Sequence, residues 1–362
     1  MISSRNLRCA TVGCGRIGGA SSPGMARFAP KHLHHVGHLE AIGTLGIAGP
    51  LAACDLDPAK FEPLKGRFGI TDWYTDIDAL LRDFQPELLT IATRTPQKRA
   101  VVEAALQAGV RGIHLEKPLC NSPQELDFYR DLARRDDVVI SNGCMRRYLA
   151  PFQAAQTLLD PETAGDVPCH ASVSMGRGTL FWTLFHALDL VLFLAGPRKP
   201  VRVQAWMEGL DLDAEGALDS DPVVHQITLA FDDGMIGEIS AKPGHTTAVF
   251  AGNRGLYLHA DGRQAQQVGP ASPDDLYLSF TDQIVDSGDV AGMQGPIRML
   301  APALHGDRAA RDTLRTAMQD FLSAQMIAFA CVESALSHGQ QIPLETFTPT
   351  RTCWGKSGPF FA

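Results

Sequence analysis

The chain has 362 residues, a formal net charge of −8 and a pI of about 5.8. This length suits two domains, each large enough to bury its own hydrophobic core. The acidic balance excludes a protein that binds the phosphate backbone of nucleic acids, because the sequence offers no basic stripe to release counterions.

The eight cysteines form no CxxC pair and mostly lie in apolar stretches. This pattern predicts reduced core residues in a cytoplasmic protein rather than a disulfide framework or a zinc site. No signal peptide precedes Leu7, and the apolar run Phe185 to Leu194 is too short to cross a membrane. We therefore expect a cytoplasmic location and no membrane partner.

A short β-rich run, Leu7 to Val12, leads directly into the sequence Gly13-Cys14-Gly15-Arg16-Ile17-Gly18. This is a GxGxxG motif placed after a strand, as in dinucleotide-binding folds. In that motif the first glycine permits a tight turn, the second lets the backbone approach a pyrophosphate, and the third allows close packing of a helix. The motif predicts a dinucleotide cofactor.

The next predicted strand, Leu51 to Cys54, ends at Asp55. A carboxylate there would bind both ribose hydroxyls of the adenosine and repel a 2'-phosphate, which favours NAD over NADP. Asp57 competes for this role. The separation from Gly18 to Asp55 is 37 positions (55 − 18), against the usual spacing of about 20.

We assign the surplus residues to an inserted loop from Ala20 to Leu33, followed by a helix from about His34 to Ile42. His34 and His38 are four apart and could share a helix face that holds a metal. The alternative is a polar wall of the cleft or a solvated face. No carboxylate or cysteine nearby completes a site, so we expect no metal.

Helical and β-rich segments alternate through the rest of the N-terminal part, which predicts a parallel sheet with right-handed crossovers. Thr93 and Thr95 follow one strand at the edge where such sheets bind ligands. The predicted helices are Ala59 to Phe68, Ile77 to Asp83, Arg99 to Ala108 and Pro123 to Arg135, and the strands are Leu88 to Ala92, Gly112 to Leu115 and Val138 to Ser141. We expect an α/β Rossmann domain over residues 1–148.

The strand from Gly112 to Leu115 leads into Glu116-Lys117-Pro118 at the ligand-binding edge. A lysine there can transfer protons, because its amine loses its charge readily when it is desolvated. Pro118 biases Lys117 to extended geometry, and the bond between them can be cis. Without its context, the tripeptide reads as an ordinary solvated turn.

After Pro151 the pattern changes to alternating β-rich segments, which predicts an α+β domain over residues 149–362 with an open, mainly antiparallel sheet. Asp232-Asp233-Gly234 marks a hairpin, and the acidic run Asp211 to Asp221 reads as solvated loops. Predicted strands are His170 to Met175, Val201 to Met207, His225 to Phe231, Met235 to Ala241, Ala248 to Ala251 and Gly255 to His259; predicted helices are Pro151 to Leu159, Phe185 to Leu194 and Arg308 to His338.

In order and spacing, these pieces resemble the glucose-fructose oxidoreductase, inositol dehydrogenase and rhizopine-catabolism (Gfo/Idh/MocA) family along nearly the whole chain. The matching pieces are the glycine motif, Ala53 to Asp57, Thr95-Pro96, Glu116 to Leu119, Arg146 to Tyr148, His186 to Asp189, Phe231 to Gly234 and Ala251 to Gly255. The resemblance implies NAD(P)-dependent oxidation or reduction of a sugar, cyclitol or related polyol. It also implies a homodimer or homotetramer formed through the C-terminal sheet.

The resemblance also implies roles for individual residues. Lys117 and His186 correspond to the family's catalytic lysine and histidine, although His186 alone would read as a helix-packing residue. Predicted cofactor-binding residues are Gly13, Gly15, Arg16, Ile17, Asp55, Thr93, Thr95, Glu116 and Lys117; predicted substrate-binding residues are Lys117, Arg147, Tyr148, Trp182, Thr183 and His186. On their own, Arg147 and Tyr148 would each read as surface residues.

The chain departs from the family at Trp182, where many members carry an aspartate four residues before the histidine. A tryptophan can stack on a sugar face but cannot accept a proton. Two other functions stay open beside a dehydrogenase, and Trp182 keeps the second of them open. One is a lyase or glycosidase that oxidises its substrate transiently with bound NAD, and the other is an NAD-binding regulatory protein without turnover.

Overall fold

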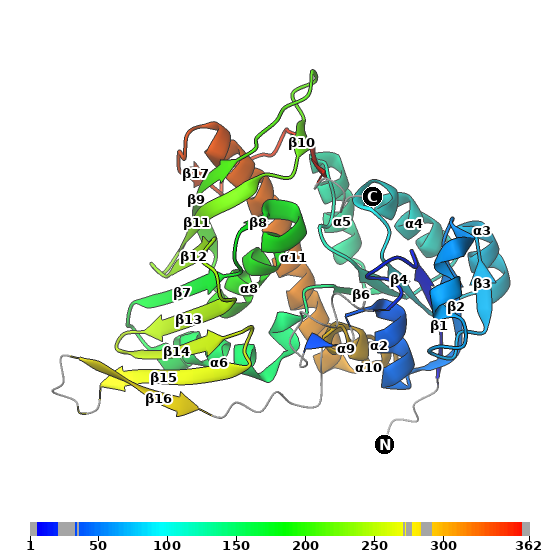
Figure 1. Ribbon diagram of the computed structural model, residues 1–362, viewed down its shortest axis with the longest axis horizontal. Coiled ribbons are helices and arrows are strands. Elements are labelled where there is room, and N and C mark those ends of the chain that lie inside the picture. Colours follow the sequence, from blue (N-terminus) through cyan, green and yellow to red (C-terminus); the bar gives the residue numbers. More distant parts are fainter. Residues whose placement is uncertain are drawn as a thin grey trace. The chain divides into compact units, whose positions relative to one another are not determined.

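The computed structural model describes residues 6–20, 33–34, 36–270, 272, 277–283 and 292–356, which divide into two compact units (Figure 1). The first unit runs to Cys120 and adds Asp127–Met145 and a segment that ends at Gln319. The second unit contains Asn121–Leu126, the stretch that begins at Arg146, and the chain from Asp320 onward. The chain thus passes between units several times, whereas the sequence analysis expected one boundary after residue 148.

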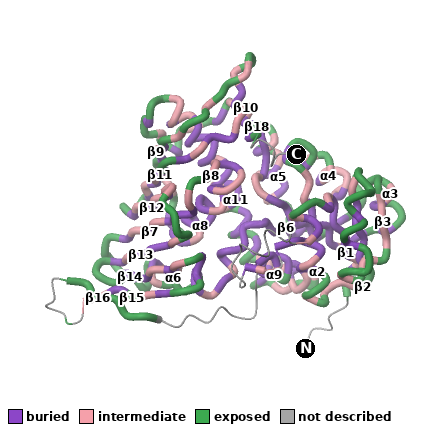
Figure 2. Tube along the Cα trace, in the orientation of Figure 1, coloured by how far each residue is buried: buried purple, intermediate pink, exposed green. Residues whose placement is uncertain are grey.

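The first unit is built on a six-stranded parallel sheet in the order β3-β2-β1-β4-β5-β6. Its strands are β1 (Leu7–Val12), β2 (Ala48–Cys54), β3 (Asp72–Tyr74), β4 (Leu88–Ile91), β5 (Gly112–Leu115) and β6 (Val139–Asn142). Every residue of β4, β5 and β6 is buried (Figure 2). This order confirms the predicted Rossmann sheet.

Helices connect and cover these strands. They are α2 (His38–Leu45), α3 (Ile77–Ala79), α4 (Thr95–Gln107) and α5 (Pro123–Ala133), whose first residues belong to the second unit. Two short helices, α9 (Gln294–Arg298) and α10 (Leu300–Leu304), contribute Ile297 and Leu300 to a core cluster that also contains residues of β1 and β2. Neither α9 nor α10 was expected from the sequence.

Two predicted helices need correction. The stretch Ala59 to Phe68 forms only short 3-10 turns, η2 (Pro58–Lys60) and η3 (Glu62–Leu64), because Pro63 lacks a backbone donor. The helix expected from about His34 begins instead at His38. His34 and His38 therefore do not share a helix face. Most of the expected loop from Ala20 to Leu33 lies outside the described residues.

The second unit contains a ten-stranded sheet, in the order β16-β15-β14-β13-β7-β12-β11-β9-β17 with β8 beside β11. Only β7 and β12 pair in parallel along this path, so the sheet is mixed but mainly antiparallel, as predicted. The strands are β7 (Cys169–Ser174), β8 (Gly178–Thr179), β9 (Pro200–Glu208), β11 (Val223–Phe231), β12 (Ile236–Ser240), β13 (Thr246–Ala251), β14 (Arg254–His259), β15 (Gln264–Pro270), β16 (Leu278–Gln283) and β17 (Ile342–Pro343).

The helices of the second unit include α6 (Ala150–Leu159), α7 (Pro161–Ala164) and α8 (Phe185–Ala195), and α11 (Arg308–Leu336) ends in it. The acidic run that was expected to be solvated instead includes β10 (Leu218–Ser220), which pairs with β18 (Cys353–Lys356). Asp221 at the end of that run is 7% exposed. Among the described residues, no helix combines the length and apolar character that a membrane crossing needs.

Candidate active site

The glycine-rich turn after β1 has the shape that a dinucleotide requires. Gly13 has a φ of +87°, and a Cβ on Gly18 would lie 1.6 Å from the carbonyl oxygen of Gly13, so both positions require glycine. At Gly15, by contrast, a Cβ would meet no described atom within 4 Å. The turn is therefore closed on its inner side and open at the residue where a pyrophosphate would approach.

Asp55 stands at the end of β2, beside this turn. Its Oδ2 accepts a hydrogen bond from the backbone N–H of Cys14 at 2.7 Å, and its Oδ1 accepts one from Asp57 at 2.9 Å. A carboxylate has about four acceptor positions, so two remain for ribose hydroxyls. Asp57 caps the turn η2 through the backbone N–H of Ala59 at 3.0 Å. Asp55 thus lies directly beside the glycine turn and Asp57 caps the next turn; the binding of a ribose by Asp55 stays a prediction.

The other predicted cofactor residues of the first unit lie at the same edge of the sheet. Arg16 is exposed and Ile17 is half-buried within the glycine turn. Thr95 opens α4 with 8% exposure, and Thr93 follows β4 with its hydroxyl buried. Because β1 and β4 are hydrogen-bonded neighbours, the segments that follow them share one edge.

Lys117 follows β5 at this edge, and the peptide bond between Lys117 and Pro118 is cis. Glu116, directly before it, is 7% exposed. Its Oε1 lies 3.1 Å from Nε2 of His38, and its Oε2 accepts the backbone N–H of Lys117 at 3.1 Å. Burial alone would raise the pKa of Glu116, but the hydrogen bond and charge of His38, with the charge of Lys117, lower it to about 2.

Three metal-ligand side chains meet near this turn: His38, His114 and Glu116, whose potential ligand atoms lie within 4.8 Å of one another. Within the described part of the chain, the ring atoms Nδ1 of His38 and Nε2 of His114 have no hydrogen-bond partner. Zinc holds nitrogen and oxygen ligands at about 2.0–2.2 Å, so ligand atoms around one ion are at most about 4.3 Å apart. One pair of these atoms, Nε2 of His38 and Oε1 of Glu116, is already 3.1 Å apart.

His186 is the second residue of α8 and is half-buried. Trp182 and Thr183 lie just before it, in the π-helical turn η6 (Leu180–Leu184). Asp221 accepts the backbone N–H groups of Phe181 and Trp182 at 2.9 and 3.0 Å. It therefore satisfies donors at the start of this turn, a role that sequence reasoning missed because 39 positions separate it from Trp182.

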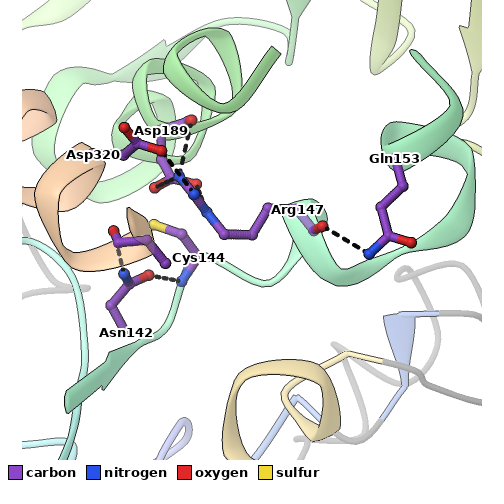
Figure 3. Close-up of polar contacts among 7 residues, drawn as sticks. Asn142, Cys144, Arg147, Gln153, Asp189 and Asp320 are labelled. Atoms are coloured by element: carbon purple, nitrogen blue, oxygen red, sulfur yellow. Dashed lines mark hydrogen bonds and ion pairs between the residues drawn. The ribbon is translucent and has the colours of Figure 1, made fainter. Parts of the chain in front are cut away.

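Arg147, in the turn η5 (Arg146–Tyr148), is 5% exposed and is held by two carboxylates (Figure 3). Its guanidinium lies 2.6 Å from Oδ1 of Asp189 and 2.9 Å from Oδ2 of Asp320. Burial disfavours the charge of Arg147, but the two carboxylates raise its pKa above the ordinary range. Burial also raises the pKa of Asp189, to about 6. The guanidinium is thus already engaged in a buried ion network.

Tyr148 follows at the end of η5 and is half-buried. Its neighbour Arg146 forms a bidentate pair with Asp261, with both distances 2.7 Å. A contact of Arg147 or Tyr148 with substrate stays a prediction, as does the approach of Lys117 and His186 to one bound substrate.

The parallel sheet, the glycine turn and the carboxylate after β2 are the features of a dinucleotide-binding domain. Residues 7–144 match the family model of the oxidoreductase family with an NAD-binding Rossmann fold. Over these residues the chain is similar to the Gfo/Idh/MocA oxidoreductases.

A D-apiose dehydrogenase of Paraburkholderia graminis is 32% identical over 114 residues, which are 32% of this chain and 26% of that protein. The chain thus matches only about a quarter of the length of this curated relative.

Solved structures cover more of the chain. An oxidoreductase from Agrobacterium radiobacter, in complex with NAD+, L-tartaric acid and magnesium, has a TM-score of 0.67 at 20% identity, over 94% of this chain and 99% of that one. An inositol dehydrogenase homologue from Azotobacter vinelandii, complexed with NADH and myo-inositol, has a TM-score of 0.70 at 17% identity, over 94% and 98%. At these identities the likeness shows a shared fold.

Proposed function

We propose that the protein is an NAD-dependent dehydrogenase or reductase that acts on a secondary alcohol of a sugar, cyclitol or sugar derivative. One observation carries the proposal: the glycine turn, Asp55 and Lys117 all lie at the carboxyl edge of one parallel sheet. Ligands of open α/β sheets bind at this edge. The names of the relatives, a D-apiose dehydrogenase and an inositol dehydrogenase homologue, support a polyol as the substrate class.

The residues around the turn suit NAD. Bound NAD would supply the nicotinamide that accepts or donates hydride. The backbone at Gly13 and Gly15 would lie against the pyrophosphate, with Arg16 and Ile17 beside it. Asp55 would accept the ribose hydroxyls, and its charge would repel a 2'-phosphate, so NADP is disfavoured.

Lys117 and His186 are the proposed proton-transfer groups. When the alcohol is oxidised, hydride leaves the carbinol carbon and the hydroxyl proton passes to one of these two bases; reduction reverses both transfers. Trp182 and Thr183, on the turn before His186, are proposed to contact the substrate, and a tryptophan ring suits the apolar face of a sugar. Arg147 and Tyr148 complete the proposed substrate-binding residues. The guanidinium of Arg147 would be held in place there by Asp189 and Asp320.

We further propose a homodimer or homotetramer formed through the sheet of the second unit. Strand β16 and the residue just before it expose large apolar side chains, with Tyr277 at 87% and Phe280 at 60% exposure. Exposed apolar residues gathered on one element are typical of a protein interface. A cytoplasmic location is also proposed, because all eight cysteines are buried thiols outside disulfides, as in a reducing compartment.

The test is to follow NADH absorbance while the protein is offered NAD with a panel of free sugars, cyclitols, glycosides and nucleotide sugars. A dehydrogenase accumulates NADH with at least one free polyol. Release of a leaving group from a glycoside without net NADH would indicate the lyase or glycosidase instead. NAD binding without turnover on the whole panel would indicate a regulatory protein.

A further inference from the structure

The carboxylate of Glu116 faces the protein's own donors, although the sequence analysis assigned this residue to the cofactor. One oxygen lies against Nε2 of His38 at 3.1 Å, and the other accepts the backbone N–H of Lys117 at 3.1 Å. His38 is fully buried at the start of α2. Because a carboxylate only accepts, Nε2 of His38 must carry the proton that it shares with Glu116.

A second buried side chain holds the same turn from α4. Lys98 is 1% exposed, and its ammonium donates to the backbone carbonyls of Glu116 and Pro118. These two carbonyls belong to the residues on either side of Lys117. A buried ammonium is costly without acceptors, so these contacts tie α4 firmly to the turn.

The surroundings of Glu116 leave its carboxylate little freedom to move. A Cβ on Gly143, just after β6, would lie 2.5 Å from Oε1 of Glu116, so the backbone there packs directly on the carboxylate. On the other side, the ring of His114 meets the ring of His38 edge-on at 4.7 Å, and His114 is itself hydrogen-bonded to Ser141 at 2.7 Å. Burial lowers the pKa of His114 well below its ordinary value, so this ring is neutral.

We infer that His38, Glu116 and Lys98 form a clamp that fixes the backbone of Lys117 and so aims its amine at the reacting hydroxyl. The inference rests on the proposed function, in which Lys117 transfers the proton. Proton transfer needs the two heavy atoms about 2.6–3.2 Å apart. A misplacement of about 1 Å can cost about a hundredfold in rate, so the backbone before the amine must be held firmly.

The clamp predicts different results for two substitutions of His38. In His38→Gln the amide nitrogen can still donate to Glu116, whereas in His38→Leu a side chain of similar size cannot. We expect His38→Leu to lower kcat at least about tenfold while the KM for NAD changes less than about threefold, and His38→Gln to recover most of kcat. The matched control is His225→Leu, which removes the histidine of a surface pair with Glu208 at 3.5 Å and should leave kcat unchanged.

Hydrogen exchange of the Lys117 backbone amide measures how firmly the clamp holds this turn, and it needs no substrate. The amide should be protected in the wild type and in His38→Gln, and should exchange at least about tenfold faster in His38→Leu while Ile113 and Leu115 of β5 stay protected. An unprotected Lys117 amide in the wild type would overturn the clamp. So would a wild-type kcat in His38→Leu, or an equal loss of kcat in both variants. A wild type without turnover but with this exchange pattern would refute the proposed function and leave the clamp standing.

Discussion

The backbone N–H of Cys14 donates to the Asp55 carboxylate at 2.7 Å, which ties the end of β2 to the glycine turn after β1. The backbone N–H of Gly13 likewise donates to the carbonyl of Cys54 at 2.8 Å. These two contacts set the carboxylate beside the place where a pyrophosphate would lie. The proposed ribose-binding group and the proposed phosphate-binding turn are therefore held together as one unit before any cofactor arrives.

The role of Asp55 predicts a change of cofactor selectivity. Asp55→Asn removes the charge that repels a 2'-phosphate and weakens the charge-assisted bonds to ribose, which are worth about 1.5–3 kcal/mol. We expect the Kd of NAD to rise about tenfold or more and the preference for NAD over NADP to shrink. Titration of both cofactors measures this. Asp57→Asn is the matched control, and a larger effect there than at Asp55 would reverse the assignment.

The glycine turn predicts opposite outcomes for two alanine substitutions. At Gly15 an added Cβ meets no described atom, so Gly15→Ala should fold normally and bind NAD at least about tenfold more weakly, because the methyl group blocks the pyrophosphate. At Gly18 the Cβ would lie 1.6 Å from a backbone oxygen, so Gly18→Ala should destabilise the fold itself. Thermal unfolding and NAD titration separate the two effects. Wild-type NAD affinity in Gly15→Ala would contradict this placement of the cofactor.

Glu116 predicts a specific loss of stability in acid. Its pKa is lowered to about 2 from an ordinary value of 4.5. The ionised carboxylate therefore contributes fully to the free energy of unfolding above about pH 4.5, and this contribution is lost as the pH falls toward 2. The contribution is about 3 kcal/mol. In urea unfolding, the difference in unfolding free energy between the wild type and Glu116→Gln should shrink as the pH is lowered from 5 to 2.5. Glu62→Gln, at an exposed position, is the control. A gap that does not depend on pH would show that Glu116 is not ionised in this way.

Trp182 tests the substrate side of the second unit. Trp182→Ala should raise the KM for the polyol about tenfold or more, because the ring no longer stacks on the substrate. Trp206→Ala, which removes a 41% exposed tryptophan on β9, is the control and should leave the KM unchanged. An unaffected KM in Trp182→Ala would remove this residue from the substrate site.

The sequence predicted the elements whose patterns are local. The strands β1, β4 and β5 are short apolar runs between turn signals, and the GxGxxG motif predicts the tight turn that follows β1. The short helices α9 and α10 were missed because Pro296 and Pro302 interrupt any helical pattern there. Strand β15 was missed because its glutamines resemble a loop, although Ala265 and Val268 are buried and the strand pairs with β14 and β16.

The side-chain partners at the candidate site could not be predicted from the sequence. His38 and Glu116 are 78 positions apart, and the pair forms only because β1, β4 and β5 bring the two segments together. Lys98 was given no role from the sequence, since no local signal reveals that its ammonium reaches two backbone carbonyls. Asp221 read as part of a solvated acidic run for the same reason. Long-range polar contacts depend on the assembled fold, which a one-dimensional pattern does not contain.

The most direct measurement of the central claim is NADH formation by wild-type protein and by Lys117→Met, with a polyol that the wild type oxidises and with NAD affinity measured in parallel. We expect Lys117→Met to bind NAD within about threefold of the wild type while kcat falls by about 10²-fold or more, the size of a lost acid-base group. An unchanged kcat in Lys117→Met would contradict the assignment of proton transfer to this lysine.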